Sequence, residues 1–340
     1  MTTTVIRLTA ADGTIGWGEA CTLGSNYIEA SAATTMAAVE ELAPHVAAVD
    51  PLAPALLAVT MDAAMRGQTA GKSAIDGAFW DLRGKLLGQP VANLIGGQHQ
   101  ASYPIFHALT LDDPARMAEE ADAKQTEGYR HWQIKLGDAP DDDAQRTRSV
   151  LAVVGRDAQF VTGDANGGWT VANALQFLHG VEGSFLYVEQ PCRTLRELAE
   201  VRRRTSLPVI ADEAIRDGYE LIEGHRMGAT DGINIKPARV GGLTKACRIR
   251  DLAQQLGLMV MIDESMGGGI ATAAMGHLAV SVEQGHLLAA SHLSDFTDVE
   301  MLLGGGAVNA AGRGSLTDGP GFGIDVDEGA LGDPVFVYST

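Results

Sequence analysis

Eight short apolar runs, separated by amphipathic stretches, fill the chain from about Tyr103 to about Leu293. They recur within the period of roughly 20–50 residues that signals a repeated supersecondary unit. Eight parallel strands, each followed by a helix, close into a barrel whose reactive residues gather at the carboxyl ends of the strands. The predicted strands lie within residues 103–107, 133–137, 160–164, 186–189, 208–212, 232–236, 258–263 and 287–292.

Acidic residues end three successive runs, at Asp164, Glu189 and Asp212. Because the carboxyl ends of parallel strands meet at one rim of a barrel, we expect these three side chains to converge. They offer hard oxygen ligands, and waters or substrate oxygens would complete the octahedron that Mg²⁺ prefers. The sequence therefore predicts an Mg²⁺ site, with Mn²⁺ as a substitute.

Lysines end the second and sixth predicted strands, which lie roughly opposite each other around an eight-stranded ring. We expect Lys135 and Lys236 to flank a substrate, one removing a proton from the carbon next to a carboxylate and the other delivering one. This role requires the cation and partial burial to lower a lysine pKa from about 10.4 toward neutrality. The alternative is structural, with Lys135 paired to Asp164 and Lys236 paired to Glu213 or Asp212.

Further polar side chains near the strand ends are candidates for binding or supporting the substrate. Asn166 is expected to support the first ligand. Asp263 and Glu264 are expected to orient Lys236 or contact the substrate, the alternative being a solvated acidic pair. The full set of supporting candidates is Gln133, Asn166, Glu213, Asp263, Glu264, Tyr27 and Asp295.

Two other features suggest chemistry that we do not assign. A lone histidine is more often structural than catalytic, which applies to His107, His131 and His292. The glycines at 267–269 lack the Lys-Ser/Thr ending of a phosphate-binding loop, so nucleotide binding is a weak alternative.

The segments on either side of the barrel predict a second domain. Residues 3–20 are predicted to form two strands joined by a hairpin turn at Asp12-Gly13. Helices are predicted over residues 29–49 and 71–87, and weak strands over the glycine-rich tail, including residues 334–338. The expected fold is α/β: an α+β capping domain (1–100), a modified (β/α)8 TIM-type barrel (101–303) and a C-terminal segment (304–340) that packs back on the cap.

Charge and composition exclude several classes of protein. The chain of 340 residues has 25 Lys and Arg against 43 Asp and Glu, a net charge of −18 that would repel nucleic acids and anionic membranes. Its three cysteines stand at no metal-ligand spacing and are interpreted as reduced thiols of a cytoplasmic protein. No apolar stretch approaches the roughly 20 residues of a membrane span. We expect a cytoplasmic enzyme acting on a small-molecule carboxylate.

As an ordered set, the motifs resemble the enolase superfamily, in the branch named for mandelate racemase and muconate lactonizing enzyme. The resemblance covers nearly the whole chain and implies a capping domain over a modified barrel, Mg²⁺, an enediolate formed next to a carboxylate, and dimers or octamers. Relative to the family, the chain starts inside the capping domain, without its first strand and mobile loop. The motifs are Gly16-Trp17-Gly18-Glu19, Ser73-Ala74-Ile75-Asp76, residues 80–85, Lys135, Asp164-Ala165-Asn166, Glu189-Gln190-Pro191, Ala211-Asp212-Glu213, Lys236 and Val240-Gly241-Gly242-Leu243.

Four motifs narrow the resemblance within the branch: Gln133 two residues before Lys135, Asn166-Gly167-Gly168-Trp169, Glu189-Gln190-Pro191-Cys192 and Arg202-Arg203-Arg204-Thr205. With them the chain looks most like enzymes of proline derivatives, namely cis-3-hydroxy-L-proline dehydratases and 4-hydroxyproline betaine 2-epimerases. Relatives usually carry Trp-Gly-Gly-Asp after the seventh strand, whereas this chain has Met266 followed by three glycines, which removes an aromatic face for a methylated ammonium. The resemblance therefore favours dehydration of cis-3-hydroxy-L-proline to a cyclic imine, a lyase reaction. The alternatives are an epimerase or racemase of an amino acid derivative, a cycloisomerase or acid-sugar dehydratase, and a barrel that binds ligand without turnover.

Overall fold

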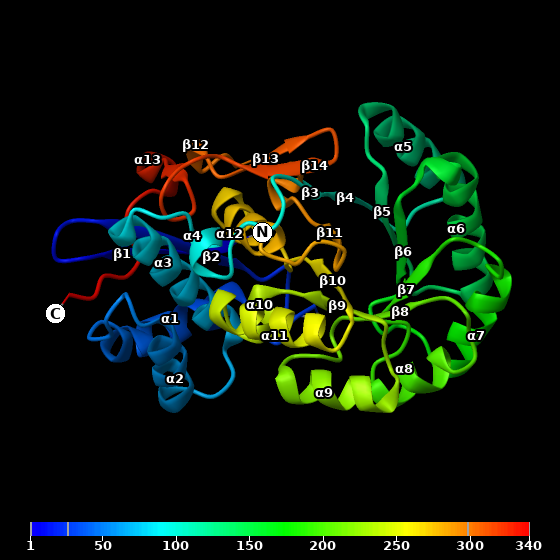
Figure 1. Ribbon diagram of the computed structural model, residues 1–340, viewed down its shortest axis with the longest axis horizontal. Coiled ribbons are helices and arrows are strands. Elements are labelled where there is room, and N and C mark those ends of the chain that lie inside the picture. The colour runs from blue at the N-terminus through cyan, green and yellow to red at the C-terminus, as the bar shows by residue number, and fades with distance from the viewer. Residues whose placement is uncertain (1, 26, 298, 340) are drawn as a thin grey trace.

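The structure is a computed structural model that describes residues 2–25, 27–297 and 299–339. A barrel, teal through green and yellow to orange in Figure 1, lies beside a smaller domain built from the N-terminal segment. Cys21, Cys192 and Cys247 are free thiols. No helix in the described ranges has the length and apolar character that crossing a membrane requires.

The predicted eight-stranded parallel sheet is confirmed. Its strands follow the order of the chain around the sheet, and an isolated parallel bridge between Ile105 and Ala290 joins the first strand to the last. The strands are β4 (Phe106–Leu109), β5 (His131–Lys135), β6 (Phe160–Asp164), β7 (Tyr187–Glu189), β8 (Val209–Ala211), β9 (Gly232–Ile235), β10 (Met259–Ile262) and β11 (Leu287–Ala290).

Helices follow the strands and form the outer layer of the barrel (Figure 1). Several begin at a local signal: Asp113, Thr170, Thr194 and Asp217 each accept a backbone N–H of the following first turn. The helices are α5 (Pro114–Glu127), α6 (Pro140–Val154), α7 (Val171–Gly180), α8 (Leu195–Arg202), α9 (Gly218–Met227), α10 (Pro237–Val240), α11 (Leu243–Gln255) and α12 (Gly269–Val280), with the 3-10 turns η1 (Gly155–Asp157) and η2 (Leu293–Phe296).

A layer of buried side chains identifies which residues face the barrel axis. Phe106, Phe160, Ile210 and Met261 come from the alternate strands β4, β6, β8 and β10, and they pack in one cluster. Strands that are not neighbours can touch only across the interior of a barrel. Because side chains alternate along a strand, residues two or four positions further on also face the axis, at the rim.

The capping domain forms much as the pattern predicts. Strands β1 (Thr3–Thr9) and β2 (Ile15–Cys21) pair as the expected antiparallel hairpin. The helices are α1 (Ala32–Val46), α2 (Pro54–Ala64), α3 (Thr69–Leu87) and the short α4 (Val91–Leu94). The predicted helix over 29–49 is shorter at both ends, and its start is fixed by a capping box that Ser31 forms with Thr34. Helix α2 was not predicted.

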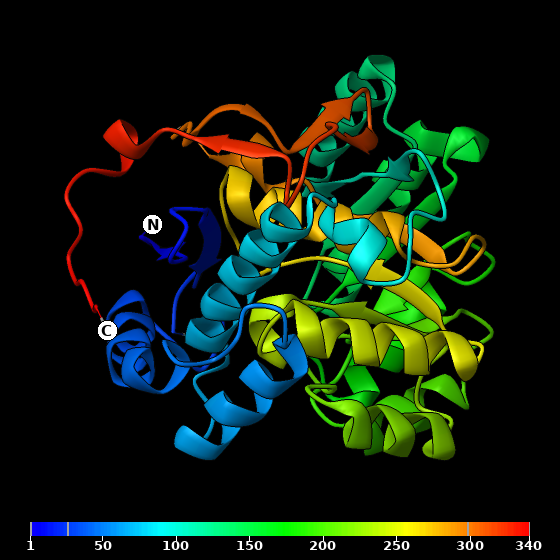
Figure 2. The ribbon, with the colours of Figure 1, turned by 60° about the vertical axis from the view of Figure 1, so that its left-hand side comes forward.

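The C-terminal segment contacts both domains. It contains β12 (Leu302–Gly305), β13 (Ala307–Ala310), β14 (Arg313–Leu316), β15 (Ile324–Val326) and α13 (Glu328–Leu331), and β14 pairs with β3 (Tyr103–Pro104), which directly precedes the first barrel strand. The backbone N–H of Phe322 donates to Asp81 of the cap at 2.7 Å. Figure 2 shows the segment running on along the outer edge of the cap. The predicted strand at 334–338 is wrong: these residues are exposed and pair with no strand of the described chain.

Close packing between β2 and α3 explains why glycine stands at position 18. A Cβ atom there would overlap the carbonyl oxygen of Ala74 in α3. We predict that Gly18→Ala lowers the free energy of unfolding by about 1–3 kcal/mol, the usual cost of overpacking. Chemical denaturation followed by circular dichroism measures this loss. Gly13→Ala is the control, because it adds the same Cβ atom at a glycine where that atom would overlap nothing. Gly13 has a positive φ of 89°, which strains the backbone of an alanine, but no atom lies within 4 Å of the added Cβ. Equal stability of Gly18→Ala and the wild type would contradict the packing argument.

Candidate active site

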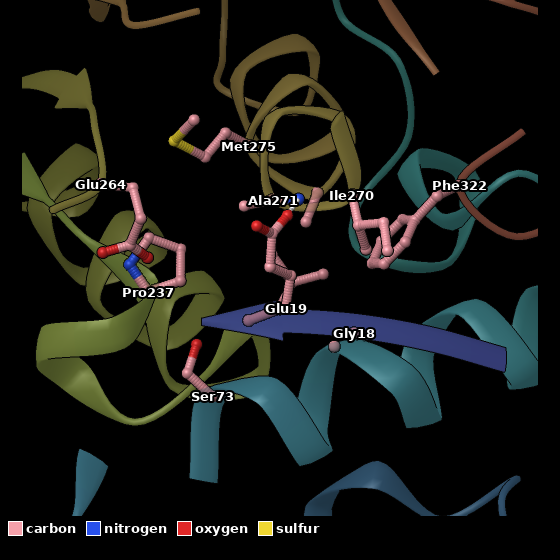
Figure 3. Close-up of a pocket in the computed structure, with 12 residues that line it drawn as sticks. Gly18, Glu19, Ser73, Pro237, Glu264, Ile270, Ala271, Met275 and Phe322 are labelled. Carbon is pink, nitrogen blue, oxygen red and sulfur yellow. Dashed lines mark hydrogen bonds between the residues drawn. The ribbon is translucent and has the colours of Figure 1, made fainter. Parts of the chain in front are cut away.

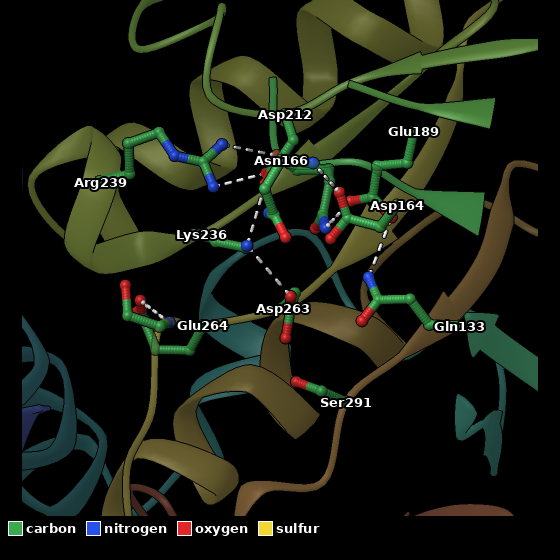
Figure 4. Close-up of polar contacts among 12 residues, drawn as sticks. Gln133, Asp164, Asn166, Glu189, Asp212, Lys236, Arg239, Asp263, Glu264 and Ser291 are labelled. Carbon is green, nitrogen blue, oxygen red and sulfur yellow. Dashed lines mark hydrogen bonds and ion pairs between the residues drawn. The ribbon is translucent and has the colours of Figure 1, made fainter. Parts of the chain in front are cut away.

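Strand register brings the three predicted carboxylate ligands together at one rim of the barrel. Asp164 lies four residues after Phe160, and Asp212 two residues after Ile210, so both face the axis. Asp164 is also the direct neighbour of Glu189 across β6 and β7. All three carboxylates are fully buried. The interior face and the register therefore place them in the cluster that Figure 4 draws.

Two amides hold Glu189. Gln133 of β5 donates to Oε2 at 2.9 Å, and Asn234 of β9 donates to Oε1 at 2.6 Å. Burial raises the pKa of Glu189 well above its ordinary value, and Asp164 and Asp212 raise it further. Glu189 is thus a buried carboxylate held by neutral donors and repelled by its neighbours.

Both lysines are paired with carboxylates, as the structural alternative expected. Lys135 Nζ lies 2.6 Å from Asp164 Oδ2. Lys236 Nζ lies 3.0 Å from Asp212 Oδ2 and 3.3 Å from Asp263 Oδ2 (Figure 4). Lys236 is fully buried, whereas the side chain of Lys135 keeps 27% of its exposure. The pairing of Lys236 with Glu213 is not observed.

These ion pairs determine the charge of the lysines. Burial lowers the pKa of Lys236, but the Asp212 and Asp263 carboxylates raise it by more, so it stands well above the ordinary value. Burial likewise lowers the pKa of Lys135, but Asp164, together with Tyr27 and Glu189, raises this pKa above its ordinary value. The protein alone therefore keeps both lysines protonated, and the predicted fall toward neutrality depends on a cation that draws the carboxylates away.

The capping domain closes over Lys236. The Tyr27 hydroxyl lies 2.7 Å from Lys236 Nζ, and the centroid of its ring is 5.2 Å from that nitrogen. Burial raises the pKa of Tyr27 to about 12, so the phenol stays neutral. Tyr27, predicted from the sequence, thus reaches the barrel rim from the cap.

Comparison with known proteins identifies the family of this site. Residues 116–330 match the family described as enolase C-terminal domain-like, and residues 1–96 match the mandelate racemase / muconate lactonizing enzyme N-terminal domain. The chain belongs to the enolase superfamily. The cis-3-hydroxy-L-proline dehydratase of Roseibium aggregatum is 38% identical over 99% of this chain and 91% of that protein.

Other relatives in the enolase superfamily have different activities. Solved structures in the superfamily also share the fold of this chain. The N-succinyl-L-Arg/Lys racemase of Bacillus cereus is 29% identical over 83% of this chain and 77% of its own length. A crystal structure of a superfamily member from Roseovarius nubinhibens, complexed with magnesium, has a TM-score of 0.95 at 33% identity over 99% of this chain and 92% of that chain. The fold and the superfamily are therefore shared, while the reactions of the relatives range from dehydration to racemisation.

The superfamily likeness calls for a test of whether this site suits Mg²⁺. Within the described ranges, no three or more His, Cys, Asp and Glu side chains stand in a ready-made metal cluster. The reason is visible in the contacts, since each candidate ligand turns toward a basic group or an amide. The donor set nevertheless fits a hard dication, because six carboxylates face only three basic groups. The carboxylates are Asp164, Glu189, Asp212, Glu213, Asp263 and Glu264, and the basic groups are Lys135, Lys236 and Arg239.

Two residues that contact the carboxylate cluster, Arg239 and Asn234, were not predicted from the sequence. The Arg239 side chain keeps 9% of its exposure and lies 2.5 Å from Asp212 Oδ1, whereas Lys236 contacts the other oxygen, Oδ2 (Figure 4). Asn234 supports Glu189. Both follow from spacing: Asn234 stands two residues before Lys236 on the same face of β9, and Arg239 stands one helical turn after it in α10.

The remaining candidates separate into two groups. Asn166 donates to Glu213 at 2.8 Å, and burial followed by Asp212 and Asp164 raises the pKa of Glu213 to about 7. Asp295 lies elsewhere, because η2 directs it to the Tyr129 hydroxyl at 3.3 Å and to Asn309 at 2.6 Å. Tyr129 precedes β5, at the opposite end of that strand from Lys135, so the predicted role of Asp295 at the substrate site is corrected.

Proposed function

We propose that this protein is an Mg²⁺-dependent dehydratase that converts cis-3-hydroxy-L-proline to a cyclic imine. The observation that carries the proposal is the pair Lys135 and Lys236: Lys135 ends the second barrel strand, Lys236 directly follows the sixth, and each is paired with a carboxylate of the cluster. The R. aggregatum dehydratase, similar along nearly the whole chain, supports the choice of substrate.

The geometry of the substrate suits two opposed lysines. In cis-3-hydroxy-L-proline the hydroxyl lies on the same ring face as the carboxylate, so the α-proton and the leaving hydroxyl are on opposite faces. One lysine takes the α-proton, and the other, as an ammonium, protonates the departing oxygen, which leaves as water. The enamine that remains tautomerises to the cyclic imine.

Asp164, Glu189 and Asp212 would hold Mg²⁺ in this proposal. When bound, the dication would neutralise charge that builds on the substrate carboxylate as the α-proton leaves. Gln133, Asn234 and Arg239 orient the carboxylates. Tyr27 covers Lys236 from the cap, which limits the access of water to that lysine.

A second reaction fits the same two lysines. Epimerisation of proline betaine also needs a base on one face and an acid on the other. The Tyr27 ring lies near the rim, with its centroid 5.2 Å from the Lys236 ammonium, and this aromatic group supports the alternative although Met266 replaces the aromatic residue of relatives. The dehydratase ranks first because of the similar enzyme of known activity.

We predict cyclic-imine formation when purified protein and Mg²⁺ are mixed with cis-3-hydroxy-L-proline. Imine formation and optical rotation are followed in parallel for this compound and for proline betaine. Chelator-treated protein is the matched control and is expected to form no imine. Rapid epimerisation of the betaine without imine from the hydroxyproline would overturn the ranking in favour of the epimerase.

A further inference from the structure

A carboxylate of the capping domain sits at the start of a barrel helix. Glu19 of β2 accepts the backbone N–H of Gly268 at 2.7 Å and that of Ala271 at 2.9 Å, at the N-terminus of α12. Figure 3 shows Glu19 reaching from β2 toward α12. Free N–H groups and the helix dipole make this end of a helix a site for an anion. Glu19 fills that site from within the molecule.

The three consecutive glycines, Gly267 to Gly269, make this approach feasible. A Cβ at Gly268 would lie 2.5 Å from Met301 and 3.4 Å from Glu19 Oε1, and one at Gly269 would lie 2.5 Å from Leu302. Only residues without side chains fit between the cap and the C-terminal segment here. The glycines thus serve a close contact between domains, and the anion they help to bind is Glu19.

A short loop runs from Gly268, which contacts Glu19, back to Asp263, which pairs with Lys236. Four residues separate Gly268 from Asp263, and the Asp263 carboxylate lies 3.3 Å from Lys236 Nζ. Next to Asp263, Glu264 accepts the N–H of Ala238 at 2.7 Å and that of Ser265 at 2.8 Å. Glu264 therefore joins the loop to the turn that follows Lys236. Glu19 and Glu264 line one cavity of about 20 Å³ (Figure 3), a space for a single water molecule, so the intervening region is closely packed.

We propose that Glu19 is a positioning residue for the acid–base chemistry of Lys236. This inference rests on the proposed function. Glu19 fixes the start of α12, α12 fixes the loop, and the loop holds Asp263 and Glu264 against Lys236 and its neighbour Ala238. A shift of about 1 Å in a reacting group can cost a hundredfold in rate.

The route from Glu19 reaches only one of the two lysines. Lys135 stands on β5 and pairs with Asp164 of β6. The hydrogen bonds that Glu19 accepts come from Thr3, Gly268 and Ala271, and none of these residues lies on β5 or β6. Loss of the Glu19 contact should therefore affect Lys236 and leave Lys135 in place.

The test replaces Glu19 by glutamine, which keeps the size of the side chain but sets an NH₂ group against one of the two N–H donors. We expect dehydration of cis-3-hydroxy-L-proline to slow by roughly tenfold in kcat, with KM within about twofold. Exchange of the α-proton of L-proline and D-proline in D₂O reports the two faces separately. Slowing is expected for the enantiomer whose exchange Lys236→Ala abolishes, and not for the other. Glu41→Gln, at an exposed position on α1 of the cap, is the matched control.

The exchange rates of the two proline enantiomers distinguish a positioning role from a general loosening of the cap. A loosened cap would slow α-proton exchange of both enantiomers. That result would overturn the proposal, and so would an unchanged rate of dehydration. Mg²⁺ affinity, measured by calorimetry, is expected to stay within about twofold, because Glu19 contacts none of Asp164, Glu189 and Asp212. If the wild type neither forms imine nor exchanges an α-proton, the proposed function fails and the role of Glu19 fails with it. If the wild type is active and only the Glu19→Gln pattern differs from expectation, the positioning role alone fails.

Discussion

Lys236→Ala is expected to lower kcat for dehydration by about a hundredfold to ten-thousandfold, the usual contribution of a positioned acid or base. One face of the substrate would lose its proton-transfer group, while Lys135 would remain on the other. Exchange of the α-proton in D₂O should accordingly persist for one enantiomer of proline and vanish for the other. Imine formation and NMR-detected exchange measure the two effects.

The Ala variant also removes a buried cation from Asp212 and Asp263. Leaving buried charges unpaired can destabilise a protein by about 3–5 kcal/mol. Lys236→Arg separates loss of catalysis from loss of stability. Arginine keeps the positive charge beside the two carboxylates, but it stays protonated in proteins and so cannot act as a base. Lys245→Ala, at a lysine of α11 that pairs with Asp62 of the cap, is the control for loss of a lysine outside the site. Wild-type turnover in either Lys236 variant would contradict the assignment.

Much of this site follows from two periodicities in the sequence. The alternation of side chains along a strand places Asp164, Asp212 and Asp263 on the interior face, and the parallel arrangement gathers strand ends at one rim. Both rules act locally and need no knowledge of distant contacts. The position of Asp164, Glu189, Asp212, Lys135 and Lys236 at one rim could therefore be predicted from the chain, and the same spacing places Asn234 and Arg239 beside them.

Features that depend on tertiary contacts were predicted less well. The apolar, β-branched and aromatic run at residues 334–338 has the composition of a strand, but a strand forms only where a neighbouring edge is available, and in the described structure no strand pairs with this run. Asp295 follows a barrel strand, yet the path of η2 directs it to Tyr129. The role of the glycines at 267–269 required the position of Glu19, which is about 250 residues away in the chain. Local pattern cannot specify which distant segments meet.

The charge of the lysines shows a further limit. Their residue type and position indicated acid–base chemistry, but the pKa of each lysine is raised by the carboxylate beside it. Asp164 and Asp212 are thus shared between two roles, as partners of the lysines in the protein alone and as proposed ligands of a dication. The site is consistent with a cation that competes with Lys135 and Lys236 for the same carboxylates.

Glu189→Gln is expected to abolish both Mg²⁺ binding and turnover. Glu189 is the best ligand to replace, because its hydrogen bonds come from the amides of Gln133 and Asn234 and its loss leaves no buried cation unpaired. Replacing Asp164 or Asp212 would instead release Lys135, or Lys236 together with Arg239. A glutamine retains the shape of the side chain but offers one neutral oxygen in place of a carboxylate, which a hard dication binds far less well.

Thermal unfolding with and without Mg²⁺ measures this loss independently of activity. A ligand that binds only the folded protein stabilises it by about 2.7 kcal/mol at a concentration one hundred times its Kd. The wild type should show such a shift, and Glu189→Gln should show none, while Glu182→Gln, at an exposed position after α7, should behave as the wild type. Circular dichroism of the metal-free proteins establishes that the variant is folded. A full Mg²⁺ shift in folded Glu189→Gln would remove Glu189 from the ligand set, and retained turnover after chelation would remove the metal from the mechanism altogether.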